Sequence, residues 1–240
     1  MRVVLRGLGA QVARPSVPAT VCRMAQVAGL LARGPWAPSQ VRVAWRKDPY
    51  EPDPAAVRAA DVALDALRAR GSPSHDGLAA RLSSFKARQD DLSLELQPAR
   101  WALRLVPQRA SESLSILCAV RSADGRWLAG RRAAWLASWA GRWALGAGGS
   151  VEVEENPIDT MARELEEEWS VAPQQLTIEA LVRLRSGMVL LIGMAWISEG
   201  ATVVPDSEHD EFAWWLAEVG RWPAEADEPL RRVGVLLAGG

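Results

Sequence analysis

The sequence predicts a mixed α/β protein, in which a mixed β-sheet with few helices follows a smaller mixed α/β domain. Two kinds of apolar periodicity and the chain length support this fold class. Apolar residues recur at helical spacing in 55–70 and 158–169, whereas 92–97 alternates and 113–121 runs apolar like strands. A chain of 240 residues, 49% of them hydrophobic, can bury a core in one large or two small domains.

The charge distribution separates the two parts of the chain. The net charge of −1 is the sum of +8 over 1–47, −1 over 48–108 and −8 over 109–240. The basic residues of the first segment are spaced singly, which favours solvated arginines of an ordinary domain over a nucleic-acid arm or a targeting peptide. We expect an accessory domain of unknown role over 1–108 and a second domain over 109–240, and no polymeric nucleic acid as a partner.

The cysteines and the apolar stretches favour a cytoplasmic protein. Cys22 and Cys118 lie far apart and match no metal-ligand spacing, so reduced thiols are the default. The longest apolar stretch, 188–197, is about half of the roughly 20 residues that a membrane-spanning helix needs. We therefore expect neither a membrane span nor a membrane partner.

The expected elements follow from periodicity and from breakers such as Gly34-Pro35, Gly71 and the turn Asp124-Gly125. Helices are expected at 21–32, 55–70 (after Pro54), 74–86 (with Ser74 as the cap), 158–169 and 226–237. Strands are expected at 41–45, 92–97, 100–106, 113–121, 127–132, 182–185, 188–197 and 212–215.

The helix expected at 158–169 carries two stripes. The apolar stripe consists of Ile158, Met161, Ala162, Leu165 and Trp169. Glu164, Glu167 and Glu168 fall on another face, where each pair of like charges costs a few tenths of a kcal/mol. Clustered carboxylates suit Mg²⁺ or Mn²⁺, which would offset this repulsion. The alternative without a metal site is an acidic helix whose glutamates are solvated.

The segment before this helix supports a ligand site. Gly146, Gly148 and Gly149 allow the backbone to approach a ligand closely or to offer a carbonyl to a metal. Glu155 lies eight positions before Arg163, so its carboxylate could brace that arginine and orient the helix against the loop.

These residues resemble the Nudix box, GX5EX7REUXEEXGU with U aliphatic. The matching positions are Gly149, Glu155, Arg163, Glu164, Leu165, Glu167, Glu168 and Val171. The sequence departs at Ser170, where the motif has the glycine that ends a helix in the left-handed conformation; a serine adopts it at a cost of about 1 kcal/mol. The chain is identified as a member of the Nudix hydrolase family, MutT-like in its box, over about 111–240.

The resemblance implies an α/β/α sandwich with a mixed sheet and metal-dependent hydrolysis of a diphosphate linkage in a nucleoside diphosphate joined to another group. It assigns Glu164, Glu167 and Glu168 to Mg²⁺ (or Mn²⁺), with the Gly149 carbonyl as a further ligand, and Arg163 and Glu155 to helix orientation. The general base varies in the family, and Glu164, Glu208 and Glu211 are the candidates because each carboxylate could face the metal cluster.

Substrate contacts are expected from residues near the glycine turn. A nucleobase could stack on Trp143, our first choice, or on Trp139, although tryptophans more often serve the core or an interface. Arg131 is a further candidate for substrate binding. For His209 two interpretations remain: a hydrogen-bonded or surface histidine without a catalytic role, and a catalytic histidine.

Other functions remain as alternatives. A non-catalytic Nudix-fold regulator that binds a nucleotide would not need the intact carboxylates, and a diphosphate isomerase would need a cysteine placed for proton chemistry. No downstream signature assigns the substrate among NADH, ADP-ribose, coenzyme A and dinucleoside polyphosphates. A homodimer is an alternative to a monomer, because so many tryptophans need burial.

Overall fold

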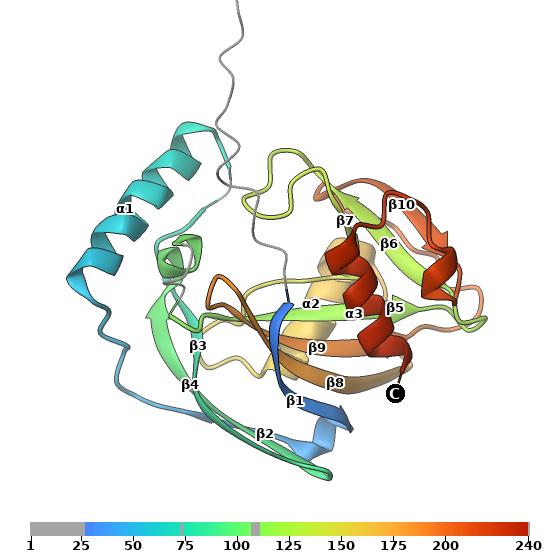
Figure 1. The fold of residues 1–240 in the computed structure, drawn as a ribbon, viewed down its shortest axis with the longest axis horizontal. Helices are drawn as coiled ribbons and strands as arrows, with labels where there is room; N and C mark the ends of the chain where they lie inside the picture. Colours follow the sequence, from blue (N-terminus) through green and yellow to red (C-terminus); the bar gives the residue numbers. More distant parts are fainter. Residues whose placement is uncertain (1–26, 73, 107–110, 240) are drawn as a thin grey trace, which may run out of the picture.

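A computed structural model of the 240-residue chain describes residues 27–72, 74–106 and 111–239. Two β-sheets and three α-helices make up this part of the chain (Figure 1). The larger sheet has the order β1-β8-β9-β5-β6-β10, with β7 also paired to β6. Its strands are β1 (Val27–Trp36), β5 (Leu114–Arg121), β6 (Trp127–Arg132), β7 (Trp143–Leu145), β8 (Gln175–Leu184), β9 (Val189–Trp196) and β10 (His209–Trp215). Only β5 and β9 pair in parallel among these described strands, so the sheet is mixed.

Helices α2 (Pro157–Trp169) and α3 (Glu228–Ala238) cover opposite faces of this sheet. The alternation along β5 shows the division: Ile116 and Cys118 belong to the core shared with α2, whereas Ala119 belongs to the core shared with α3. The observed architecture is the expected α/β/α sandwich with a mixed sheet.

The smaller sheet contains β2 (Val41–Trp45), β3 (Leu78–Arg88) and β4 (Asp91–Arg100), in the order β2-β4-β3. Its leucines lie in the same core as those of α2, so the two sheets are not separated by solvent. Helix α1 (Pro54–Ala69) packs on the 3₁₀ helix η3 (Trp101–Leu105) in a separate small cluster. We call α1, η3 and the smaller sheet the N-terminal module. Strand β1, which precedes the module in the chain, pairs with β8 in the larger sheet.

The first expected helix is wrong. Residues 27–36 form strand β1, and residues 21–26 and Cys22 lie outside the described residues. The apolar spacing there suits a helix locally, but β1 pairs with β8 along its length, with register shifts, and this pairing overrides the local preference.

Two further expectations are wrong for a similar reason. The helix expected at 74–86 is strand β3, whose residues pair with β4 from Leu78 to Arg88. The strand expected at 100–106 contains η3, where the consecutive residues Ala102 and Leu103 are both buried against α1. Adjacent buried residues are incompatible with the alternation of a half-exposed strand.

The other expected elements are present, β2 and β6 with the expected ends and the rest with shifted ends. The strand expected at 182–185 begins earlier, at Gln175. The terminal helix begins at Glu228, because the side chain of Asp227 caps it by accepting a hydrogen bond from the Leu230 N–H at 3.0 Å.

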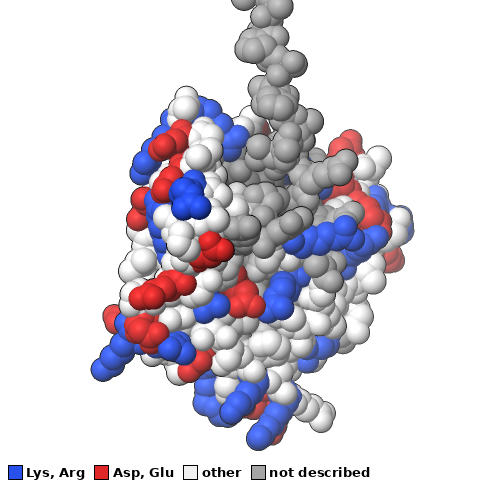
Figure 2. All heavy atoms as spheres, turned by 60° about the vertical axis from the view of Figure 1, so that its left-hand side comes forward, with Lys and Arg blue, Asp and Glu red and all other residues white. Residues whose placement is uncertain are grey.

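None of the helices in the described part of the chain combines the length and apolarity that a bilayer crossing requires. The face that carries α1 and the smaller sheet shows basic and acidic side chains intermixed, without a continuous basic patch among its described residues (Figure 2).

Candidate active site

Helix α2 is held at both ends by local interactions. Asn156 caps its start by accepting a hydrogen bond from the Ile158 N–H at 3.0 Å, and Pro157 occupies the first turn. The helix ends at Ser170, whose φ of 54° and ψ of 41° are left-handed. The serine thus takes the conformation that the glycine of the motif would provide.

The two stripes of α2 face different surroundings. Met161, Leu165 and Trp169 are fully buried in the core, whereas Ala162, expected on the same stripe, is exposed. Of the three glutamates, Glu168 is buried, Glu164 is partly buried and Glu167 is exposed. The acidic stripe therefore leads from the core to solvent.

Arg163 joins the carboxylates around the start of this stripe. Its Nε lies 3.0 Å from Oε1 of Glu155, and its Nη1 lies 2.9 Å from both Glu164 Oε1 and Glu167 Oε2. Burial alone would raise the pKa of Glu155, but hydrogen bonds from Arg163 and from the Glu152 N–H lower it overall. The structure thus brings Glu155 and Arg163 together as the spacing suggested, and Arg163 offsets part of the repulsion between the glutamates.

Glu168 has an unusual environment for a carboxylate. Its Oε1 accepts a hydrogen bond from the Gly148 N–H at 3.1 Å, but its Oε2 is buried without a hydrogen-bond partner. Burial raises the pKa of Glu168 to about 8, against the opposing effects of Arg132 and the Gly148 N–H. Burial also raises the pKa of Glu164. Such orphaned carboxylate oxygens are costly unless a cation or proton joins them.

His209 lies beside Glu168 and is buried rather than on the surface. Its Nε2 is 3.6 Å from Glu168 Oε2, its Nδ1 is 3.4 Å from Asp206 Oδ1, and its ring packs 4.2 Å from that of Trp169. Burial, together with the charge of Arg132, lowers the pKa of His209, so the imidazole is neutral at neutral pH.

The donor set fits a hard divalent cation. It consists of the carboxylates of Glu164, Glu167 and Glu168, with the orphaned Oε2 among them. The carbonyl of Gly149 accepts a hydrogen bond from the Ile116 N–H at 2.9 Å and retains a second lone pair. In the described residues, no three His, Cys, Asp or Glu side chains converge closely enough to hold a metal as they stand. Arg163 instead holds Glu164 and Glu167 in its own ion pairs.

The acidic stripe opens into a cleft of about 670 Å³. Glu164, Glu167 and Glu208 line one side of it, and Arg132 holds Glu208 through an ion pair of 3.1 Å. Its volume lies within the ordinary range for small-molecule sites, about 300–1,000 Å³. Of the three candidate bases, the structure brings Glu164 and Glu208 into this cleft.

The remaining candidates are divided between the cleft and other surroundings. Trp139 lines the cleft. Trp143, our first choice for stacking, instead packs against Trp215 at 5.2 Å in the core below α3, so it does not line the cleft. Glu211 and Arg131 form a half-exposed pair of 3.4 Å and do not line the cleft either.

Several residues that line the cleft were not among the predicted site residues, namely Trp101, Arg104, Arg132 and Ser150. Arg132 could have been predicted: consecutive residues of a strand face opposite sides, so if Arg131 faces away from the cleft, Arg132 faces it. Nothing local marks Trp101 or Arg104, since the segment that contains them was expected to be a strand.

The chain is similar to known proteins over about half of its length. A family profile described as NUDIX domain matches residues 112–233. The fold is similar to that of a MutT protein from Methanosarcina mazei Go1 (23% identity, 50% of this chain and 91% of that one, TM-score 0.38). It is also similar to a MutT NUDIX hydrolase from Burkholderia pseudomallei (21% identity, 52% of this chain and 97% of that one, TM-score 0.43). A further similar structure is the NUDIX domain of Shewanella oneidensis NrtR, solved with ADP ribose (20% identity, 53% of this chain and 85% of that one, TM-score 0.42). No curated protein matches the sequence.

Proposed function

Because the chain belongs to the Nudix hydrolase family, we propose that it hydrolyses the diphosphate linkage of a nucleoside diphosphate joined to another group, with Mg²⁺ or Mn²⁺ bound by Glu164, Glu167 and Glu168. The observation that carries this proposal is the orphaned, buried Oε2 of Glu168 on the same helix as Glu164 and Glu167, which line a cleft. A bound divalent cation would neutralise phosphate oxygens and lower the pKa of the attacking water.

The chain's own residues supply the other parts of the reaction. Hydrolysis forms a bond between water oxygen and one phosphorus, breaks the bond from that phosphorus to the bridging oxygen, and transfers one water proton to a base. Glu208 suits the role of base, because Arg132 holds one of its oxygens and the other can accept the proton. Glu164, whose pKa is raised by burial, is the alternative.

The proposed reaction is tested by phosphate release from a panel containing ADP-ribose, NADH, coenzyme A, nucleotide sugars and dinucleoside polyphosphates, each with Mg²⁺. Glu168→Gln and Glu167→Gln are compared with Glu166→Gln, an exposed neighbour on the same helix. We expect the first two to lower kcat by about 100-fold or more and the control to match wild type. Nucleotide binding without any turnover would refute the proposal and indicate a regulator.

The base is tested by a second matched pair. Glu208→Gln should lower kcat strongly, whereas Glu211→Gln, outside the cleft, should leave kcat unchanged. If Glu208→Gln retains the wild-type kcat, Glu208 is not the base and Glu164 takes that role.

A further inference from the structure

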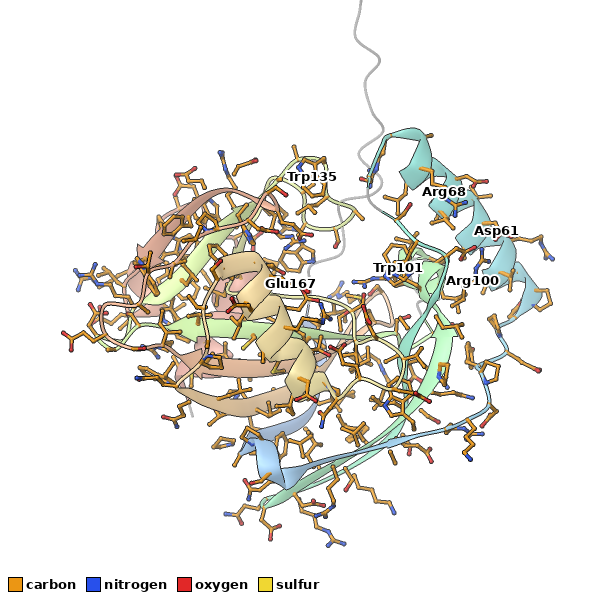
Figure 3. All side chains as sticks on the ribbon, turned by 180° about the vertical axis from the view of Figure 1, so that it is seen from behind. Asp61, Arg68, Arg100, Trp101, Trp135 and Glu167 are labelled. Atoms are coloured by element: carbon orange, nitrogen blue, oxygen red, sulfur yellow. The ribbon has the colours of Figure 1, made fainter. Side chains whose placement is uncertain are left out.

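The N-terminal module forms one wall of the candidate active-site cleft. Leu67 and Arg70 at the end of α1, His75, and Trp101 and Arg104 of η3 line the cleft opposite α2. Figure 3 shows Trp101 and Glu167 on facing sides of this space. All five of these residues precede residue 112, where the match to the family begins. This wall is therefore a feature of the chain beyond its family domain.

Arg104 is held in this wall by contacts to both parts of the protein. It donates a hydrogen bond to the hydroxyl of Ser150, which directly follows the glycine turn, and Trp101 Nε1 donates to the same hydroxyl at 3.2 Å. The guanidinium carbon of Arg104 lies 5.5 Å from the centre of the Trp101 ring, and His75 packs against that ring at 4.7 Å. The guanidinium is thus positioned before any ligand arrives.

The charge of Arg104 is not paired with a carboxylate. Within the described part of the chain, Arg104 forms no ion pair, although Arg132 across the cleft pairs with Glu208. Burial and the nearby positive charge of Arg132 lower the pKa of Arg104 to about 10. The negative charge of Glu164 acts in the opposite direction. The guanidinium therefore stays charged at neutral pH. A largely desolvated cation without an ion-pair partner is poorly satisfied and favours an anionic ligand.

We propose that Arg104 binds a phosphate group of the substrate, so that the N-terminal module completes the diphosphate site from the side opposite the glutamates. This inference rests on the proposed function, and it assigns the module a direct part in substrate binding. Guanidinium groups bind phosphate oxygens through paired, charge-assisted hydrogen bonds, and they do not exchange protons near neutral pH. Arg104 is accordingly a binding and positioning residue rather than an acid or a base.

The test measures binding of inorganic diphosphate to the full chain by calorimetry in the presence of EDTA, over a series of salt concentrations. Arg104→Gln keeps a donor for Ser150 but removes the charge, and Arg104→Lys keeps the charge without the paired geometry. Arg58→Gln, which removes an exposed arginine from α1 outside the cleft, is the matched control.

We expect Arg104→Gln to bind diphosphate about tenfold more weakly than wild type and with a smaller salt dependence, and Arg104→Lys to lie between the two. Arg58→Gln should match wild type. The change in salt dependence separates a direct charge interaction from a structural role, which would not alter it. If Arg104→Gln does not fold, Arg104→Lys decides: intermediate affinity supports the proposal and wild-type affinity overturns it.

Wild-type affinity and salt dependence in Arg104→Gln would overturn the proposal, as would an equal loss in Arg58→Gln. Failure of the proposed function gives a different result. In that case no compound of the panel is hydrolysed with Mg²⁺, while diphosphate binding still depends on Arg104. Hydrolysis whose KM is unchanged by Arg104→Gln would instead overturn this inference and leave the proposed function intact.

Discussion

Gly149 and Glu164 approach each other so closely that a Cβ atom on Gly149 would overlap Oε1 of Glu164. The absence of a side chain at 149 is therefore what allows the carboxylate to occupy its place beside the turn. Rotation of the Glu164 side chain away from the turn would break the hydrogen bond that the same oxygen accepts from Arg163 Nη1 at 2.9 Å. The glycine turn and the acidic stripe of α2 are thus one sterically coupled unit.

Gly149→Ala should displace the Glu164 carboxylate and lower Mg²⁺-dependent hydrolysis more than stability. Overpacking of this kind costs about 1–3 kcal/mol when backbone must shift, and less when a side-chain end can move. Gly220→Ala is the control, since a Cβ there meets nothing within 4 Å. Activity and urea unfolding of both variants check the prediction, and wild-type activity in Gly149→Ala would contradict it.

Ser170→Gly should stabilise the protein. Ser170 has a φ of 54°, a conformation that costs a residue with a side chain about 1–2 kcal/mol. Glycine avoids this cost but has a larger conformational entropy in the unfolded state, which offsets part of the stabilisation. We expect an increase of about 0.5–1 kcal/mol in the free energy of unfolding, measured with urea. Ser170→Ala retains the Cβ and should bring no increase. A less stable Ser170→Gly variant would show that the hydroxyl, not the backbone, matters here.

The accuracy of the sequence-based predictions follows the range of the interactions. Helix α2 was predictable because its apolar stripe and its glutamates recur at helical spacing within a few turns of chain. Strand β3 was not, because its apolar spacing also suits a helix and only pairing with β4 decides between them. The same limit hid Arg104, whose place in the cleft depends on the contact of η3 with α1 and with Ser150.

The metal-free protein should lose stability as pH rises between about 4.5 and 8. The pKa of Glu168 is raised from 4.5 to about 8 by burial, so the folded state keeps a proton that the unfolded state releases in this range. One such group contributes a slope of at most about 1.4 kcal/mol per pH unit. The stability it contributes is complete below pH 4.5 and lost once the pH passes about 8.

Urea unfolding in EDTA across this range measures the effect. Burial lowers the pKa of His209 from its ordinary value of 6.5, so this group makes the protein less stable as the pH falls below 6.5. The comparison of wild type with Glu168→Gln therefore isolates the glutamate. The slope should be smaller in Glu168→Gln and unchanged in the exposed Glu166→Gln variant. An identical slope in wild type and Glu168→Gln would show that Glu168 is ionised in the folded protein.

Cys118 should resist alkylation in the folded protein. Its thiol is fully buried in β5, and burial raises its pKa to about 12, so the reactive thiolate is scarce at neutral pH. Iodoacetamide should label the peptide containing Cys118 only after denaturant is added, as judged by mass spectrometry. Rapid labelling under native conditions would mean that β5 opens locally at low cost.

Arg163→Met should destabilise the protein in EDTA, and Mg²⁺ should reverse part of the loss. The variant leaves the carboxylates of Glu155, Glu164 and Glu167 without the cation that contacts all three. Removing one member of a partly buried charge network costs about 1–3 kcal/mol. A divalent cation bound by the acidic stripe would screen the same charges, so the difference from wild type should shrink when Mg²⁺ replaces EDTA in the unfolding experiment.

The control is Arg126→Met, which breaks an exposed pair with Asp124. It should cost less than about 1 kcal/mol and be insensitive to Mg²⁺. If Mg²⁺ leaves the Arg163→Met deficit unchanged, the glutamates do not share a cation, and the repulsion between them is instead relieved by solvent.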